Sequence, residues 1–136
     1  MKLTLYADGG SRGNPGPAAS GMVLKDEAGK TIAAWGEYLG TQTNNVAEYS
    51  AVIFGLRRAL ELDADSILCI VDSKLVAEQL SGRWKVKQPH IQKLFVQAYN
   101  LTRQFKKFSI AHTPRAQNTE ADREVNKTLD EQKSPI

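Results

Sequence analysis

The sequence holds few of the residues that build covalent or zinc-bound frameworks. Its 136 residues include one cysteine and two histidines. A single cysteine cannot form an internal disulfide, so nothing requires an oxidising compartment, and no cysteine–histidine cluster has the spacing of a zinc site. Cys69 lies in an apolar run, which favours a small buried side chain over a reactive thiol.

Long hydrophobic runs are absent as well. No apolar stretch approaches the roughly 20 residues that a membrane-spanning helix needs, and the N-terminus lacks the apolar core of a signal peptide. We therefore expect a cytoplasmic protein without a membrane partner, and a monomer. The length fits a single domain, predicted at 1–131 with a polar C-terminal tail at 132–136.

Charge of one sign does not dominate. Lys plus Arg number 18 and Asp plus Glu number 15, which leaves a net charge of +3. Such a mild basic excess suits a polyanionic partner such as nucleic acid, but many unrelated proteins share it. Composition alone therefore leaves the function open.

The patterning predicts an α/β fold. Strands are expected at 2–7, 19–25, 31–39, 66–71 and 107–112, and helices at 45–62, 73–81, 89–105 and 119–131. The first three strands follow one another directly and predict an antiparallel meander, with a turn rich in glycine and proline at 8–17. The later strands alternate with helices, which favours parallel pairing and a mixed sheet. The apolar run at 66–71 is typical of a strand covered on both faces.

Four acidic residues mark the ends of strands and the first turns of helices. They are Asp8, Glu48, Asp72 and Asp122. Each has a local structural interpretation: Asp8 begins a common turn pair, Asp72 can cap the following helix, and the two others fit capping boxes. Any one of them alone is therefore an ordinary structural motif.

The register of these acids favours a shared site. Glu48 continues the apolar stripe of its helix four residues before Val52, and Asp122 precedes Val125 by three residues. Asp72 lies at the carboxyl end of a strand, where open α/β sheets place their sites. Acids that converge on a buried face repel one another unless a cation neutralises them. An all-oxygen ligand set suits Mg²⁺, with Mn²⁺ as a substitute, and two such ions about 4 Å apart would form the clamp used in phosphodiester hydrolysis.

Five segments of the chain resemble type 1 ribonuclease H. They are 6–11 (Tyr-Ala-Asp-Gly-Gly-Ser), 14–17 (Asn-Pro-Gly-Pro), 43–48 (Thr-Asn-Asn-Val-Ala-Glu), 71–73 (Val-Asp-Ser) and 112–122 (His-Thr-Pro-Arg-Ala-Gln-Asn-Thr-Glu-Ala-Asp). Each segment alone is a weak motif, but together they occur in the family's order and span nearly the whole chain. The resemblance implies a mixed five-stranded sheet with helices on both faces. It also implies endonucleolytic cleavage of the RNA strand of RNA–DNA hybrids, leaving 5′-phosphate and 3′-hydroxyl ends.

The resemblance also assigns roles to individual residues. Asp8, Glu48, Asp72 and Asp122 match the family's metal-binding acids, His112 its mobile-loop histidine, Asn14, Asn44 and Asn45 its minor-groove contacts, and Thr43 a contact to a DNA phosphate. Because RNA-containing helices expose 2′-hydroxyls in a wide, shallow minor groove, asparagine amides can bind there without reading sequence. Ser73 and the backbone of Gly9 and Gly10 are further candidates for contacts to 2′-hydroxyls, since glycine permits close approach.

Two of these assignments retain structural alternatives. Asn44 and Asn45 can cap a helix, which is compatible with groove contacts, and a histidine that ends a strand, as His112 does, often has no catalytic role. The chain also departs from the family, because the long basic insertion that grips the hybrid in many members is reduced to the segment 82–89. That segment holds Arg83, Lys85 and Lys87 around Trp84 and is interpreted either as a residual phosphate-binding patch or as a solvated loop.

Three other classes of function share features with this sequence. An exonuclease or integrase-like core would share the acids but would not need the asparagines of 14 and 44–45. A catalytically silent binder of hybrids or double-stranded RNA would gain nothing from acids that face phosphates. A mononucleotide-binding protein would need a Gly-Lys-Ser/Thr ending that the segment 9–17 lacks. Double-stranded RNA remains a second substrate to test.

Overall fold

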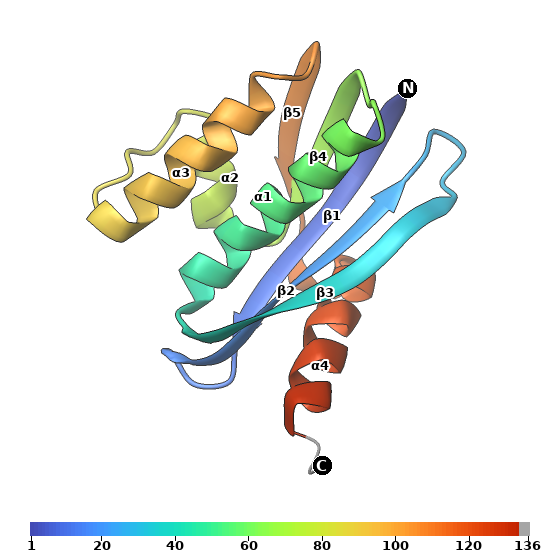
Figure 1. Ribbon diagram of the computed structural model, residues 1–136. Coiled ribbons are helices and arrows are strands. Elements are labelled where there is room, and N and C mark those ends of the chain that lie inside the picture. Colours follow the sequence, from blue (N-terminus) through green and yellow to red (C-terminus); the bar gives the residue numbers. More distant parts are fainter. Residues whose placement is uncertain (134–136) are drawn as a thin grey trace.

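The computed structural model describes residues 1–133 as a central sheet flanked by helices (Figure 1). In chain order, the elements are β1 (Lys2–Ser11), β2 (Gly16–Lys25), β3 (Thr31–Gln42), α1 (Asn44–Glu61), β4 (Ser66–Val71), α2 (Lys74–Leu80), α3 (Pro89–Thr102), β5 (Lys107–His112), the 3-10 helix η1 (Arg115–Gln117) and α4 (Thr119–Lys133). Within the described residues, no helix is long and apolar enough to cross a membrane.

The sheet is mixed, as predicted. Its strand order is β3-β2-β1-β4-β5. The β1–β2 and β2–β3 pairs are antiparallel, whereas the β1–β4 and β4–β5 pairs are parallel. A parallel partner needs a crossover connection, and helices supply it on both occasions. The carboxyl ends of β1, β4 and β5 consequently lie at one edge of the sheet.

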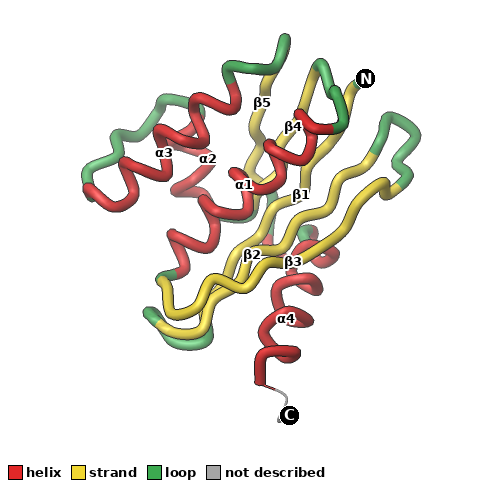
Figure 2. The backbone as a smooth tube through the Cα atoms, in the orientation of Figure 1, coloured by secondary structure: helices red, strands yellow, loops and turns green. Residues whose placement is uncertain are grey.

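Helices cover the two faces of the sheet unequally. The helices α1, α2 and α3 lie on one face, and α4 lies alone on the other (Figures 1 and 2). The larger core lies beneath α1, where Leu56 and Val52 pack with Leu3 and Leu5 of β1. On the opposite face, α4 buries a small cluster of Ala19, Val125 and Leu129. A helical layer on each face thus encloses the strands that carry the acids.

The first hairpin is tighter than the sequence indicated. The strand β1 runs to Ser11 and β2 begins at Gly16, so the predicted turn at 8–17 shrinks to four residues, 12–15. Gly9 pairs with Ser20 within the ladder. A Cβ atom on Gly9 would lie 2.2 Å from the carbonyl carbon of Ala47, so only glycine lets α1 approach β1 this closely. Glycine, which usually weakens a strand, serves helix packing here and misled the turn prediction.

The predicted burial of β4 needs correction. In β4, Ile67, Cys69 and Val71 are buried, but Leu68 and Ile70 are only half-buried. The prediction that this strand is covered on both faces was wrong, because α4 packs on β1, β2 and β3.

The ends of two helices also differ from the prediction. The helix α3 ends at Thr102 rather than at 105, although Phe105 is still buried at 7% exposure. The helix α4 continues to Lys133, so the predicted tail at 132–136 begins inside it, and residues 134–136 lie outside the described part.

Candidate active site

Three carboxylates from distant parts of the chain meet at the carboxyl edge of the sheet. Asp8 lies on β1, Glu48 on α1, and Asp72 directly follows β4. One carboxylate oxygen from each lies within 4.8 Å of the others. The three acids line a cleft of about 400 Å³.

The fold explains why these acids meet. Ala7 of β1 pairs with Val71 of β4, so the next residues, Asp8 and Asp72, emerge side by side. The first turns of α1 pack closely against the sheet at Gly9. In addition, the Oγ of Ser20 donates a hydrogen bond of 2.7 Å to the carbonyl of Ala47. Glu48 is therefore carried by a helix that the sheet holds in place.

The burial and close approach of these acids have an electrostatic cost, which raises the pKa of two of them. Burial, with repulsion from Asp72, raises the pKa of Asp8 from 3.8 to about 8. Burial, with repulsion from Asp8 and Asp72, raises the pKa of Glu48 well above its ordinary value. Among the described residues, the Oε2 atom of Glu48 is buried without a hydrogen-bond partner. Such groups are stabilised by a cation rather than by one another.

The fourth predicted acid lies at the margin of this group. Asp122 comes from α4, on the opposite face of the sheet, and hydrogen bonding to its carboxylate contributes to the raised pKa of Asp8. Asn126 Nδ2 donates to its Oδ2 at 3.2 Å, and a guanidinium nitrogen of Arg115 lies 3.7 Å from its Oδ1. Asp122 thus adjoins Asp8 but is not among the three acids that share one tight cluster.

His112 lies beside the cluster at the end of β5. Its Nε2 atom is 3.2 Å from the backbone carbonyl of Asp72, and the side chain is exposed. A carbonyl only accepts, so Nε2 must carry the proton and Nδ1 is left as the acceptor of the neutral ring. The ring is therefore anchored on one side and open to solvent on the other.

The asparagines form a connected polar edge next to the acids. The Oδ1 atom of Asn44 accepts hydrogen bonds from the N–H and the hydroxyl of Ser11, at 2.8 and 3.0 Å. Asn14 Oδ1 accepts from the backbone N–H of Asn44 at 3.1 Å. Both asparagines thus use their oxygen atoms within the protein. Asn44 and Asn45 line the acid cleft, and Asn14 lies outside its lining.

Helix capping falls to other residues than expected. Thr43 caps α1 by accepting from the N–H of Val46 at 3.3 Å, so the capping interpretation of Asn44 and Asn45 was wrong. Ser73, not Asp72, caps α2. At Gly10 a Cβ atom would make an ordinary van der Waals contact, at 3.5 Å from Cγ1 of Val125, and the residue lines the cleft together with Gly9 and Ser73.

Two residues near the acids, one behind the cleft and one in its lining, were not singled out from the sequence. Asn118 is 1% exposed, and its Nδ2 donates to the carbonyl of Ala7 at 2.9 Å and lies 3.5 Å from Asp72 Oδ2. It therefore ties β1 to the acid that ends β4. Arg115 lines the cleft and brings the only guanidinium among its lining residues. Both lie within the matching segment at 112–122, but only the fold shows that they turn toward the acids.

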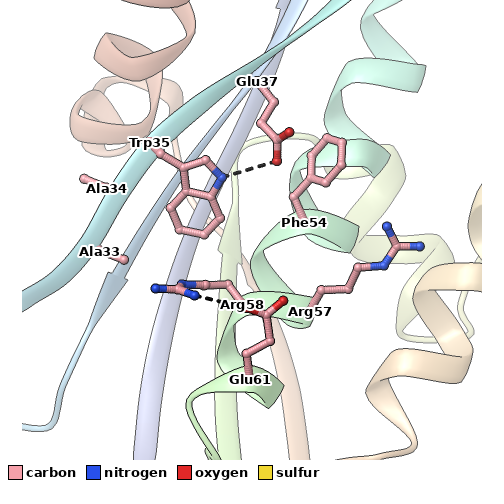
Figure 3. Close-up of a pocket in the computed structure, with 8 residues that line it drawn as sticks. All are labelled: Ala33, Ala34, Trp35, Glu37, Phe54, Arg57, Arg58 and Glu61. Atoms are coloured by element: carbon pink, nitrogen blue, oxygen red, sulfur yellow. Dashed lines mark hydrogen bonds and ion pairs between the residues drawn. The ribbon is translucent and has the colours of Figure 1, made fainter.

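A second hollow, of about 430 Å³, lies between β3 and α1 (Figure 3). Its walls include the aromatic rings of Trp35 and Phe54. The Trp35 indole N–H donates to Glu37 at 3.4 Å, and Arg58 pairs with Glu61 at 3.0 Å. None of the predicted site residues lines this hollow.

Comparison with known proteins agrees with this geometry. The model of the reverse transcriptase-like family matches residues 6–128. Ribonuclease H1 of Halobacterium salinarum is 43% identical in sequence, with a TM-score of 0.94 over 96% of this chain and 99% of that one. LC11-RNase H1, solved in complex with an RNA/DNA hybrid, is 36% identical, with a TM-score of 0.91 over 97% of this chain and 99% of that one.

Longer relatives also contain this domain. Bifunctional protein Rv2228c of Mycobacterium tuberculosis is 50% identical over 131 residues, which are 96% of this chain and 36% of that protein. The chain therefore spans about a third of the length of these mycobacterial relatives.

The sheet order and the carboxylate cluster at its edge define a ribonuclease H-like domain. The chain belongs to the type 1 ribonuclease H family, a family of hydrolases, in the short form without the basic protrusion. The family predicted from the sequence motifs is thus confirmed.

Proposed function

We propose that this chain is an endoribonuclease that hydrolyses the RNA strand of RNA–DNA hybrids and leaves 5′-phosphate and 3′-hydroxyl ends. The observation that carries the proposal is that the three clustered carboxylates share one cleft with Asn44 and Asn45. Acids suited to hydrolysis of a phosphodiester therefore lie beside amides suited to a minor groove. The family of the chain, and a relative solved with an RNA/DNA hybrid, support the same substrate.

The residues of the cluster fit a divalent cation. Their ligand atoms are carboxylate oxygens, one of which is buried and unpartnered among the described residues, and this set suits Mg²⁺ with Mn²⁺ as a substitute. We assign the ligand role to Asp8, Glu48, Asp72 and Asp122. A cation bound there supplies an activated water and neutralises charge on the phosphodiester. The protein keeps the acids close before binding, and a bound cation would favour the deprotonated form of Asp8.

The polar edge provides donors for the hybrid. Because Asn14 and Asn44 use their Oδ1 atoms within the protein, their amide N–H groups are the atoms left to reach acceptors in the minor groove. The hydroxyls of Thr43 and Ser73 accept from helix N–H groups and keep their own protons to donate, Thr43 to a DNA phosphate and Ser73 to the RNA strand. Such contacts recognise the shape of the duplex and its 2′-hydroxyls rather than a base sequence.

His112 is placed to handle protons at the rim of the cluster. Its Nε2–H is held by the carbonyl of Asp72, so Nδ1 faces away as a free acceptor. A ring in this position can take a proton from an incoming water or assist the departure of the product. It does so next to Asp72 without being one of the clustered ligands.

The short basic loop completes the proposed substrate surface. Arg83 is committed to Glu78, at 2.6 Å, which leaves Lys85 and Lys87 as the loop's cations for phosphates. Both lysines line a third hollow, a cavity of about 240 Å³, together with Asn45. Asn45 lines the acid cleft too, so the lysines extend the same surface away from the acids.

The test is a comparison of substrates under matched conditions. The purified protein is incubated with uniformly labelled RNA–DNA hybrid, double-stranded RNA and double-stranded DNA, with Mg²⁺, with Mn²⁺ or with excess chelator. We expect internal cuts in the hybrid RNA, products that a phosphatase alters at their 5′ ends, and no cutting with chelator. Cutting of double-stranded RNA would add a second substrate. Full activity in excess chelator, or cutting of DNA alone, would refute the proposal.

A further inference from the structure

The basic loop between α2 and α3 is an exposed segment with few means of holding its shape. Residues 81–85 are exposed, and so are 87 and 88. Its first half is fixed to the end of α2 by backbone bonds from Arg83 and Trp84 to the carbonyl of Glu78, at 2.9 and 3.1 Å. Its second half, which carries the two lysines, depends on different contacts.

The side-chain amide of Gln79, a buried residue of α2, contacts that second half. Gln79 is 5% exposed, and its Nε2 donates to the backbone carbonyl of Lys85 at 3.3 Å. Its Oε1 accepts from the hydroxyl of Tyr49, a fully buried residue of α1 that directly follows Glu48. One side chain of α2 therefore links the helix of a clustered acid to the loop that carries the lysines.

The chemistry of the three groups permits one arrangement. The carbonyl of Lys85 can only accept, so the nitrogen of Gln79 must face it and the oxygen must face Tyr49. The hydroxyl of Tyr49 then donates to that oxygen. A buried amide whose partners are fixed in this way resists rotation, because each alternative leaves a polar group unpaired.

The position of the loop determines the shape of the cavity of about 240 Å³ beside the Gln79 amide. Gln79 forms part of its lining, with Asn45 of α1 and the residues Lys85, Lys87 and Gln88 of the loop. The hydrogen bond to Lys85 acts together with one from Gln92 Nε2 of α3 to the carbonyl of Val86, at 2.9 Å, and links this half of the loop through Tyr49 to α1. It thereby sets the distance between the lysines and the asparagine edge.

We propose that Gln79 is a positioning residue for substrate affinity: it holds the Lys85–Lys87 half of the loop at the spacing from α1 that lets both lysines reach phosphates of a duplex bound at Asn45. Gln79 itself touches no substrate. The inference rests on the proposed function, because it takes a hybrid as the ligand of this surface.

The decisive variant is Gln79→Leu, which removes both hydrogen bonds at similar size. We expect KM for the hybrid to rise about 10-fold while kcat stays within about twofold, since the acids are untouched. The slope of log Kd against log salt should fall by about one to two, the loss expected for one or two phosphate contacts. Tyr49→Phe leaves the bond to Lys85 in place and should give a smaller change in the same direction.

Controls separate positioning from simple loss of stability. Gln97→Leu, at an exposed site of α3, makes the same chemical change away from the loop and should leave KM and the salt slope unchanged. In the Lys85→Ala/Lys87→Ala background, Gln79→Leu should add nothing further. All assays are run well below each variant's melting temperature.

The outcomes distinguish the two levels of the proposal. The positioning role would be overturned if Gln79→Leu raised KM equally in the unaltered protein and in the Lys85→Ala/Lys87→Ala background. It would also be overturned if Gln79→Leu lowered kcat alone. An unchanged KM and salt slope in Gln79→Leu would do the same while the hybrid nuclease activity stands. Absence of hybrid binding by the unaltered protein would instead defeat the proposed function.

Discussion

Two hollows of nearly equal size differ in how their charges are satisfied. The hollow between β3 and α1 measures about 430 Å³ and the acid cleft about 400 Å³. In the first, Arg58 pairs with Glu61, Glu37 accepts from the indole of Trp35, and Arg57 adds a second guanidinium to the lining, so that the charges of both signs are mixed. In the second, the three carboxylates have no cation close enough to form an ion pair among the described residues.

The contrast teaches that volume is a poor guide to chemistry in this protein. Groups that satisfy one another contribute to a stable surface and have little capacity left for a ligand. Acids held close against their mutual repulsion have a large affinity for whatever neutralises them. The proposed site of reaction is therefore the hollow whose carboxylates have no neutralising partner among the described residues.

The sharpest test of this contrast removes one charge from the acid cleft. Asp8→Asn should lower kcat for the hybrid by about 1000-fold or more, because the variant loses a ligand at the centre of the cluster. Hybrid binding should be unchanged or tighter, since a negative charge near phosphates has gone. Steady-state turnover and fluorescence anisotropy measure the two quantities. Near-normal turnover would remove Asp8 from the site.

A change at the rim should have a smaller effect. His112→Ala removes the ring that is anchored on the carbonyl of Asp72 and should lower kcat by about 100-fold, a typical contribution of a proton-transfer group. Single-turnover and steady-state rates together tell which step the ring assists. If only the steady-state rate falls, His112 acts on product release. An unchanged rate in both assays would assign it a structural role.

Without metal, the acid cleft should also make stability depend on pH. Asp8, with a pKa raised from 3.8 to about 8, binds its proton more tightly in the folded protein than in the unfolded chain. The free energy of unfolding should therefore fall by more than about 1 kcal/mol as pH rises across that window. Melting temperatures in chelator between pH 4.5 and 8.5 measure the decline.

Mg²⁺ should reverse this decline at the upper end of the range, because binding requires the deprotonated acids. Asp8→Asn should show a weaker pH dependence in chelator than the unaltered protein. Asp65 and Glu78 have lowered pKa values and act on stability mainly below this window. A melting temperature that is flat or rising between pH 4.5 and 8.5 would contradict the raised pKa of Asp8.

The smallest effect is expected in the other hollow. Arg58→Ala breaks an exposed ion pair, so it should change the free energy of unfolding by less than about 1 kcal/mol. Hybrid cleavage should stay within about twofold of normal. A loss of activity comparable to that of His112→Ala would show that the hollow between β3 and α1 takes part in the reaction.

Much of this fold could be predicted from the sequence because its signals are local and periodic. The apolar stripe of α1 and the alternation of β1 report burial directly, and the meander followed by alternating helices predicts a mixed sheet. Prediction failed where distant packing overrides local preference. Gly9 and Gly10 read as a turn, yet β1 continues through them because α1 lies against Gly9.

The acids themselves could be found from register, but their partners could not. A carboxylate on an apolar stripe, such as Glu48, is conspicuous in a sequence. Asn118, whose amide ties Ala7 to Asp72, looks like any polar residue before a helix, and only the coordinates show that it is buried. The same holds for Gln79, whose partners come from α1 and from the loop.

The position of α4 on the far face of the sheet has a consequence for biosynthesis. Asp122 is the last of the four acids in the chain, and it reaches Asp8 only when α4 has docked behind β1, β2 and β3. A nascent chain that has emerged only as far as β5 can already form every strand of the sheet. It still lacks Asp122, the fourth of the acids. We therefore expect catalytic competence only after α4 has left the ribosome and docked on the sheet.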